Sequence, residues 1–276
     1  DGTVIGIQGP PGNGKTTLAK MGMSKCLIDS DGTPRPFAMI ALGGSSNAST
    51  LVGHNFTYVG STWGKIVDIL IEKQCMNPII YIDEVDKISR TEHGREITGI
   101  LTHLTDSTQN DHFEDRYFSG IPFNLSKALI IMSFNDSSLI DPILRDRMHI
   151  IKTNPLSAQD KIEVVNRHVL PDIVRKVGFS DEDIVMTEDT ILYIINSYTY
   201  EAGVRKLKEL LYEIIREVNL RSICDSSNDQ FPLEITVEMA KDILRKKHFL
   251  RVKTIHDAPC VGLINGLYAT GAGIGG

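Results

Sequence analysis

The stretch Gly9-Pro10-Pro11-Gly12-Asn13-Gly14-Lys15-Thr16 decides the fold of this chain. It matches GxxxxGK[ST], the pattern of a phosphate-binding loop, in which glycines let consecutive backbone N–H groups turn towards phosphate oxygens. The apolar run from Val4 to Ile7 precedes the loop, and a helical pattern from Thr16 to Leu27 follows it. This order places the loop at a helix N-terminus, where the partial positive charge favours anions. A glycine turn beside an ordinary amphipathic helix is the alternative, and the full spacing of the pattern makes it the weaker one.

The loop predicts a binding site for ATP and Mg²⁺. In this pattern the lysine, Lys15, bridges the β- and γ-phosphates, and the hydroxyl of Thr16 ligates the metal. The predicted nucleotide-binding residues are Gly9, Pro10, Pro11, Gly12, Asn13, Gly14, Lys15, Thr16 and Thr17.

Apolar runs and helical patterns alternate through the first half of the chain. Further strand-like runs cover Ala38 to Leu42, Ile79 to Ile82 and Ala128 to Ser133, and helical patterns cover Gly64 to Gln74 and Arg95 to Leu104. Continuous rather than alternating apolar runs are typical of parallel strands covered on both faces. Residues 1–153 are therefore expected to form a doubly wound α/β nucleotide-binding domain with a parallel sheet.

The pattern becomes helical after residue 153. Helices are expected over Ser157 to Leu170, with Ser157 as N-cap, and over Thr187 to Tyr198, Gly203 to Arg221 and Val237 to Phe249. Residues 154–250 are thus expected to form a small α-helical lid domain. The Gly-rich apolar segment 251–276 is expected to be the truncated start of a further domain, because the chain opens without Met and ends on Gly275-Gly276.

Composition limits the function classes. The 276 residues carry a net charge of −6 and are 41% hydrophobic, which is typical of a soluble globular protein and makes nucleic acid an unlikely partner. No apolar run approaches the roughly 18 residues of a membrane-spanning helix. The four cysteines form no CxxC pair, so neither zinc nor a disulfide framework is expected.

Two predicted strands end in residues suited to phosphate chemistry. Asp83 and Glu84 follow the run Ile79 to Ile82. A carboxylate pair at the tip of a buried strand is costly without a cation, so we assign Asp83 to the metal and Glu84 to activating the attacking water. Asn135 follows the run Ala128 to Ser133 and is placed to orient water against the γ-phosphate. An exposed strand end and a turn-forming Asn are the alternatives.

A pair of arginines follows in Leu144-Arg145-Asp146-Arg147-Met148. An arginine supplied in trans stabilises transition-state charge in phosphoryl transfer. A surface ion-pair cluster explains the same residues equally well.

The ordered set of motifs resembles AAA+ ATPases and, more narrowly, the ATPase module of Lon proteases. The resemblance runs nearly end to end, and its most specific parts are TYVG (Thr57 to Gly60) and YTYEAGVRKL (Tyr198 to Leu207). Three departures stand outside the nucleotide core: the uncharged stretch Ser45 to Thr50, Tyr200 where the family usually has Arg, and the second cation Arg145.

The resemblance implies roles that the residues alone do not. Arg147 matches the arginine finger that reaches a neighbouring subunit's nucleotide, Arg205 the sensor arginine of the lid, and Asn135 the first sensor. Tyr58 and Val59 match the pore loop that grips an unfolded polypeptide, although a half-buried strand tyrosine is the plain alternative for Tyr58.

The family also implies an ATPase that unfolds and translocates unfolded or misfolded proteins into a serine protease chamber. It implies a homohexameric ring in the cytoplasm or, alternatively, the mitochondrial matrix. The Ser–Lys dyad of that family lies beyond these residues. An AAA+ remodeller without proteolysis, such as a nucleic-acid-associated loader, and a non-hydrolysing ATP-binding scaffold are the competing hypotheses.

Overall fold

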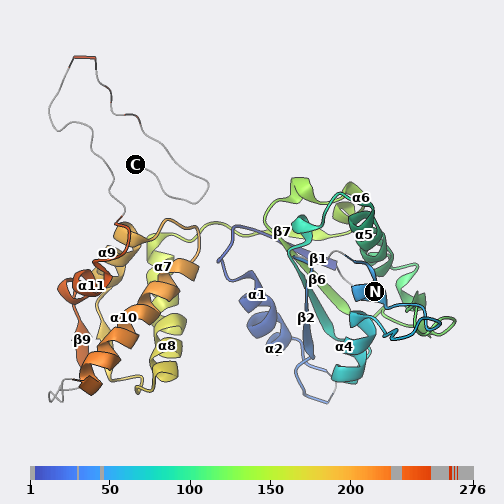
Figure 1. Ribbon diagram of the computed structural model, residues 1–276, viewed down its shortest axis with the longest axis horizontal. Helices are drawn as coiled ribbons and strands as arrows, with labels where there is room; N and C mark the ends of the chain where they lie inside the picture. Colours follow the sequence, from blue (N-terminus) through green and yellow to red (C-terminus); the bar gives the residue numbers. More distant parts are fainter. Residues whose placement is uncertain are drawn as a thin grey trace. The chain divides into compact units, whose positions relative to one another are not determined.

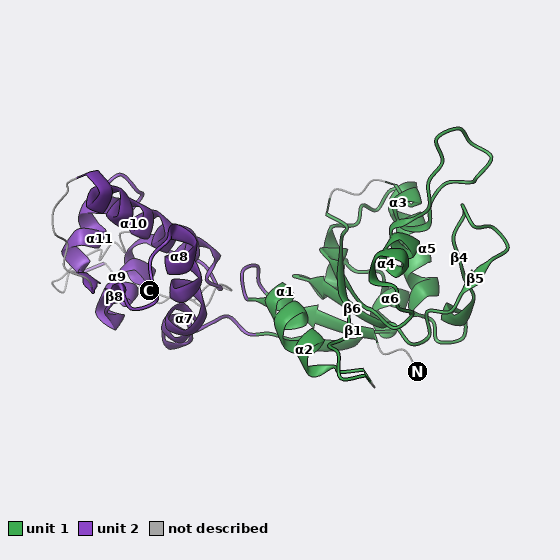
Figure 2. Ribbon diagram, turned by 90° about the horizontal axis from the view of Figure 1, so that it is seen from below, with its two compact units in different colours: residues 1–9, 14–153 green, residues 10–13, 154–276 purple. Residues whose placement is uncertain are grey.

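A computed structural model of the chain describes residues 4–29, 31–43, 47–224 and 232–249, together with residues 261, 262, 264 and 266. It forms two compact units, shown in green and purple in Figure 2. The first comprises residues 1–9 and 14–153, and the second comprises residues 10–13 and 154–276. The tip of the phosphate-binding loop therefore groups with the second unit. The further domain expected at residues 251–276 lies almost wholly outside the described residues.

The first unit is an α/β domain. Its strands are β1 (Val4–Gln8), β2 (Phe37–Ala41), β3 (Ile79–Asp83), β4 (Phe113–Glu114), β5 (Pro122–Phe123), β6 (Leu129–Phe134) and β7 (His149–Lys152). Its helical segments are α1 (Lys15–Thr17), η1 (Leu18–Met23), α2 (Ser24–Cys26), α3 (Ser49–Val52), α4 (Lys65–Lys73), η2 (Val85–Lys87), α5 (Glu92–Thr105), η3 (Asn110–His112), η4 (Ser137–Leu139) and α6 (Pro142–Asp146).

Five strands form one parallel sheet in the order β2-β3-β6-β1-β7. The four strands expected from the apolar runs are confirmed as β1, β2, β3 and β6. The sequence did not predict β7, because His149 and Lys152 are exposed and leave no continuous apolar run. All five strands run the same way, so their carboxyl ends share one edge, at which ligands bind in open α/β sheets.

Helices cover both faces of this sheet, which explains why its central strands β3 and β6 are almost wholly apolar. Ile80, Ile82 and Met132 face a core that α3, α4, α5 and α6 help to bury, while Ile79, Tyr81 and Ile131 face the opposite core with Ala19. Figure 1 shows α1 and α2 on one side of the sheet and α4, α5 and α6 on the other. The doubly wound parallel fold is therefore confirmed.

The second unit is helical. It contains α7 (Ala158–Val164), η5 (Val165–Val169), α8 (Leu170–Val177), α9 (Glu188–Tyr198), α10 (Arg205–Cys224) and α11 (Val237–Leu244), with a two-stranded parallel sheet of β8 (Ile184–Met186) and β9 (Leu233–Ile235). Ser157 caps α7 in a capping box with Asp160, as its position before the apolar stripe predicts. The short strands were missed, since three residues are too few to show a period. The core of this unit includes Ile191, Leu207 and Ile214.

Within the described residues, the longest helices are too short or too polar to cross a membrane.

Candidate nucleotide site

The phosphate-binding loop connects β1 to α1 at the carboxyl edge of the sheet. Gly12 and Gly14 have φ angles of 78° and 81°, which residues with a Cβ rarely adopt. Gly9 lies so close to Thr153 that a Cβ would sit 1.9 Å from its hydroxyl oxygen, and its N–H donates to the Phe134 carbonyl at 3.1 Å. The glycines are therefore required by backbone conformation and by a close approach. A Cβ at Gly14 would meet nothing within 4 Å, so the loop faces open space there.

Lys15 points back across the loop. Its Nζ donates to the Gly9 carbonyl at 2.6 Å and to Asn135 Oδ1 at 3.1 Å. Burial lowers the pKa of Lys15 below its ordinary value, while Asp83 and Asp86 oppose the shift. The Lys15 ammonium group therefore lies at the carboxyl edge of the sheet, with the carboxyl ends of β3 and β6.

The oxygen ligands predicted for a metal lie on adjacent elements. Thr16 Oγ1 is 3.1 Å from the hydroxyl of the buried Tyr81. Asp83 Oδ1 accepts from the Ser133 hydroxyl and from the Glu84 N–H, the latter at 3.0 Å. Hydroxyl and carboxylate oxygens are the donor types that Mg²⁺ takes in proteins. The residues present therefore fit a magnesium–nucleotide group.

Glu84 adopts an unusual backbone conformation directly after β3. Its φ of 60° is left-handed, which is uncommon for a residue with a side chain and a sign of local constraint. Its carboxylate accepts from Lys87 and lies against Gly43, where a Cβ would sit 1.7 Å from Oε2. The sequence did not identify either contact, because both depend on the turn at Glu84.

Asp86 positions the Asn135 loop, and sequence reasoning missed it. One oxygen of Asp86, Oδ2, accepts the N–H of Asn135 at 2.9 Å and that of Asp136 at 3.3 Å. The segment after β3 thereby fixes the segment after β6. The repeated acid in Asp83-Glu84-Val85-Asp86 was the available signal.

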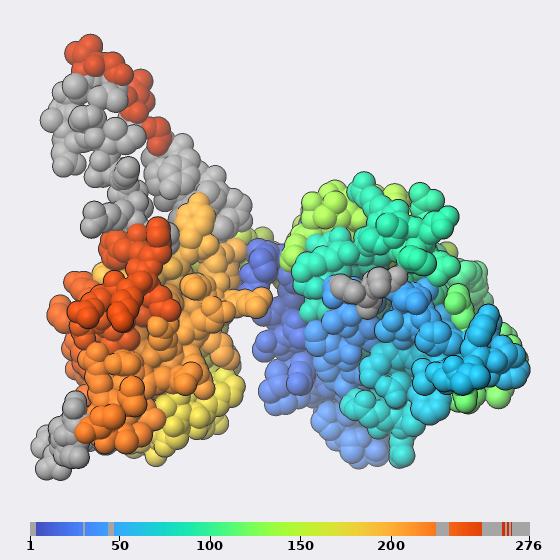
Figure 3. Space-filling view, in the orientation of Figure 1, coloured from blue at the N-terminus to red at the C-terminus, as the bar shows by residue number. Residues whose placement is uncertain are grey.

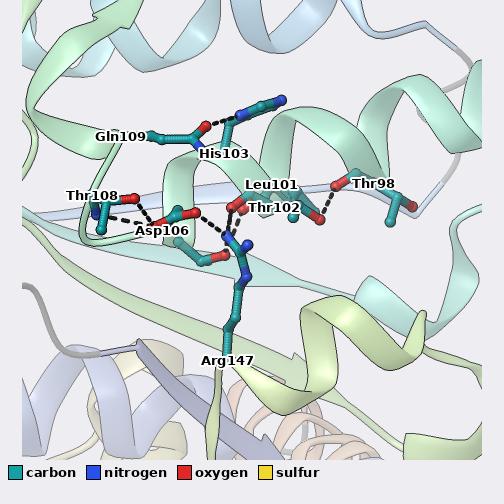
Figure 4. A network of polar contacts seen from close by, with 9 residues as sticks. Thr98, Leu101, Thr102, His103, Asp106, Thr108, Gln109 and Arg147 are labelled. Carbon is teal, nitrogen blue, oxygen red and sulfur yellow. Dashed lines mark hydrogen bonds and ion pairs between the residues drawn. The ribbon is translucent and has the colours of Figure 1, made fainter.

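Arg147 is engaged within its own unit (Figure 4). Its NH1 donates to the Thr102 carbonyl at 2.6 Å and lies 3.0 Å from Asp106 Oδ2, at the C-terminal end of α5. Hydrogen bonds from Thr108, and then the charge of Arg147, hold the pKa of Asp106 below its ordinary value. The structure therefore does not bring Arg147 to the Lys15 edge of its own chain.

Arg205 begins α10 next to the tip of the loop, within the second unit. A Cβ on Gly12 would lie 3.2 Å from the Arg205 Cβ, and the Val204 N–H donates to the Gly12 carbonyl at 3.2 Å. The Arg205 side chain itself is 80% exposed.

Glu201 and Lys161 hold this start of α10 in place. The Glu201 carboxylate accepts the N–H groups of Lys206 and Leu207, both at 2.9 Å. The buried Lys161 donates to the Glu201 carbonyl at 2.6 Å. A single lysine on the helix expected over Ser157 to Leu170 gave no sequence signal for this burial.

Tyr58 and Val59 lie in a loop between α3 and α4, with exposed fractions of 67% and 107%. Figure 3 shows this light-blue segment projecting from the first unit. Tyr58 is therefore not the half-buried strand residue of the plain alternative. Phe56 and Trp63, which the sequence analysis did not single out, are also exposed in this loop.

The base of this loop is closely fixed. The fully buried Asp115 accepts the N–H of Gly64 at 2.8 Å and that of Tyr117 at 2.9 Å. A Cβ at Gly64 would lie 2.2 Å from the Leu51 carbonyl oxygen. The exposed tip is thus held by a rigid frame.

The fold and this edge define a P-loop nucleoside triphosphatase. Residues 5–156 match the ATPase family associated with various cellular activities (AAA), and residues 175–230 match the Lon protease AAA+ ATPase lid domain. The chain belongs to the AAA ATPase family, and part of its second unit matches the lid domain model of Lon proteases.

Curated relatives agree with this assignment. A Lon protease homolog of Acanthamoeba polyphaga mimivirus is 35% identical over 100% of the chain and 31% of its own length. The Lon protease of Campylobacter concisus is 35% identical over 99% of the chain and 32% of its own length. A mitochondrial Lon protease homolog of Candida dubliniensis is 35% identical over 86% of the chain and 22% of its own length. The chain thus spans a third or less of these relatives.

Proposed function

We propose that this chain hydrolyses ATP with Mg²⁺ and uses the energy to unfold and thread protein substrates for a Lon-like serine protease. The exposed, rigidly framed loop of Tyr58 and Val59 carries the threading part of the proposal, because it gives the ATPase domain a surface for gripping a polypeptide. The names of the relatives carry the proteolytic part.

Each of the predicted residues at the carboxyl edge of the sheet has a role in ATP hydrolysis. Lys15 holds the phosphates, and Asn135, which already contacts Lys15, positions water. The Glu84 carboxylate takes a proton as the water oxygen attacks the γ-phosphorus and the bond to the β-phosphate oxygen breaks. Thr16 and Asp83 would hold Mg²⁺, which would supply positive charge to the phosphates. Lys87 competes for Glu84, so the ion pair between them restrains the base before substrate binds.

The two arginines suit a homohexameric ring in which ATP lies between subunits. Arg205 contacts phosphate in its own chain, and its position beside Gly12 supports this role. Arg147 contacts the nucleotide of a neighbouring chain. Within its own chain, contacts with Asp106 and Thr102 fix the side chain at the end of α5. The cytoplasm is the proposed compartment. The mitochondrial matrix is the alternative, which the name of one relative supports.

The threading role is tested with Tyr58→Ala and Tyr58→Phe. ATP turnover is measured with and without a reduced and alkylated, permanently unfolded polypeptide. Tyr58→Ala is expected to keep basal turnover and lose the stimulation, while Tyr58→Phe retains most of it. Ile71→Ala, which truncates an apolar side chain on α4 that is also exposed, is the control. Undiminished stimulation of Tyr58→Ala would contradict threading, and stimulation by DNA instead would favour a nucleic-acid-associated remodeller.

A further inference from the structure

Tyr81 is a buried tyrosine whose hydroxyl lies among the predicted metal ligands. Its side chain is 0% exposed, and it packs in the same apolar core as Ile7, Ala19 and Ile131. A phenol in such a core is unfavourable unless its hydroxyl has a hydrogen-bond partner. The hydroxyl is 3.1 Å from Thr16 Oγ1. An apolar residue would fill this core without a polar group, so the hydroxyl is the feature that calls for an explanation.

Strand geometry places several polar side chains on the same face of the sheet. Alternate residues of a strand point to one face, so Asp83 shares the face of Tyr81 on β3. On the neighbouring strand β6, Ser133 shares the face of Ile131, which is paired with Tyr81. Thr16 on α1 covers this face and contacts the Tyr81 hydroxyl. Side chains from three elements therefore meet at the carboxyl edge.

These side chains form a continuous chain of hydrogen bonds between the two predicted metal ligands. Thr16 Oγ1 contacts the Tyr81 hydroxyl, which is also hydrogen-bonded to Ser133. The Ser133 hydroxyl in turn donates to Asp83 Oδ1. Tyr81 and Ser133 are both fully buried, so bulk water has no access to the two middle members of the chain.

The carboxylate at one end fixes the direction of this chain. A carboxylate only accepts hydrogen bonds, and each hydroxyl has a single proton to donate. Because Ser133 gives its proton to Asp83, it accepts from Tyr81, and Tyr81 in turn accepts from Thr16. The Thr16 proton therefore points towards the phenol, and the lone pairs of Thr16 Oγ1 stay available. An oxygen ligand of a cation has to present a lone pair rather than a proton.

We propose that Tyr81 and Ser133 are positioning residues that orient the Thr16 hydroxyl for Mg²⁺ by holding its proton away from the cation. The inference rests on the proposed magnesium–nucleotide site, in which Thr16 and Asp83 are the ligands. Neither Tyr81 nor Ser133 is a ligand itself. They act as partners of the ligands, and removal of such partners commonly lowers metal affinity by about 10–100-fold.

Tyr81→Phe tests this role, because it removes the phenol hydroxyl and keeps the ring in the core. The Kd of a non-hydrolysable fluorescent ATP analogue is measured in EDTA and at rising Mg²⁺ concentrations. We expect the midpoint of the Mg²⁺ dependence to rise about tenfold or more in Tyr81→Phe, while the Kd in EDTA stays that of the wild type. A variant that merely distorts the loop would change the Kd in EDTA. Tyr117→Phe is the matched control, because it removes a phenol hydroxyl between β4 and β5 rather than on β3.

A double-mutant cycle separates one chain of hydrogen bonds from two independent contacts. Ser133→Ala breaks the next link, so the double variant is expected to lose no more Mg²⁺ affinity than Ser133→Ala alone. Additive losses, or a Mg²⁺ dependence in Tyr81→Phe that matches Tyr117→Phe, would overturn the inference. Asp83→Asn distinguishes the two levels of the proposal. If it also leaves the Mg²⁺ dependence unchanged, the proposed metal site fails together with this inference, whereas a loss in Asp83→Asn alone overturns only the role of Tyr81.

Discussion

Gly203→Ala tests the contact between the lid helix and the loop tip. The added Cβ would lie 2.2 Å from the Gly12 carbonyl oxygen, 2.3 Å from its carbon and 2.9 Å from the Asn13 nitrogen. These are backbone atoms and cannot rotate away, so Gly12 or the start of α10 has to move by about 1 Å to restore ordinary contact distances. Overpacking of this kind costs about 1–3 kcal/mol. The Val204–Gly12 hydrogen bond is also weakened.

The displaced residues belong to the phosphate-binding loop, so the cost falls on nucleotide binding. A loss of about 1–3 kcal/mol corresponds to a Kd raised by roughly fivefold to a hundredfold. Titration with a fluorescent ATP analogue measures the Kd, and urea unfolding measures the free energy of unfolding. Gly99→Ala is the control, because a Cβ on that helical glycine meets nothing within 4 Å and is expected to stabilise by about 0.5–1 kcal/mol. A folded Gly203→Ala chain with an unchanged Kd would refute the reasoning.

Two further predictions concern buried polar groups. Asp115→Ala leaves the Gly64 and Tyr117 N–H groups without their acceptor. We therefore expect the free energy of unfolding, measured in urea, to fall by about 2–4 kcal/mol, and proteolysis within residues 53–64 to become faster. Unchanged cleavage would contradict the role of Asp115. Burial lowers the pKa of Lys161 in the folded chain. The unfolded chain therefore binds more protons between that pKa and the ordinary value, and the free energy of unfolding rises with pH across this window. In unfolding curves at alkaline pH, Lys161→Met should lack the rise of the free energy of unfolding with pH that the wild type shows. The same pH dependence of this free energy in both chains would contradict the prediction.

The sequence predicted the parts of the site that depend on local pattern. The glycine spacing, the apolar strands and the polar residues after Ile82 and Phe134 follow from periodicity and chain order, and the parallel sheet brings their ends to one edge. Contacts between segments far apart in the chain leave no local pattern in the sequence. Asp86 on the Asn135 loop, Asp115 under the Tyr58 loop and Gly203 against Gly12 depend on tertiary packing.

The sequence could not predict the contacts of the Arg147 side chain either. The sequence left a trans-acting arginine and a surface ion pair equally open, and the family resemblance favoured the first. The structure places the guanidinium between the Thr102 carbonyl and Asp106, which no spacing in the sequence links to it. Its role across a subunit boundary stays a proposal.

We propose that Glu84 makes this site a hydrolase, and Glu84→Gln tests this role most directly. The amide keeps the shape of the side chain and cannot accept the proton from water. Loss of a general base lowers turnover by roughly 10²–10⁴-fold. We expect steady-state ATP turnover to fall by this factor while the affinity for the ATP analogue stays near that of the wild type. Equal, non-zero turnover in the two chains would contradict the account.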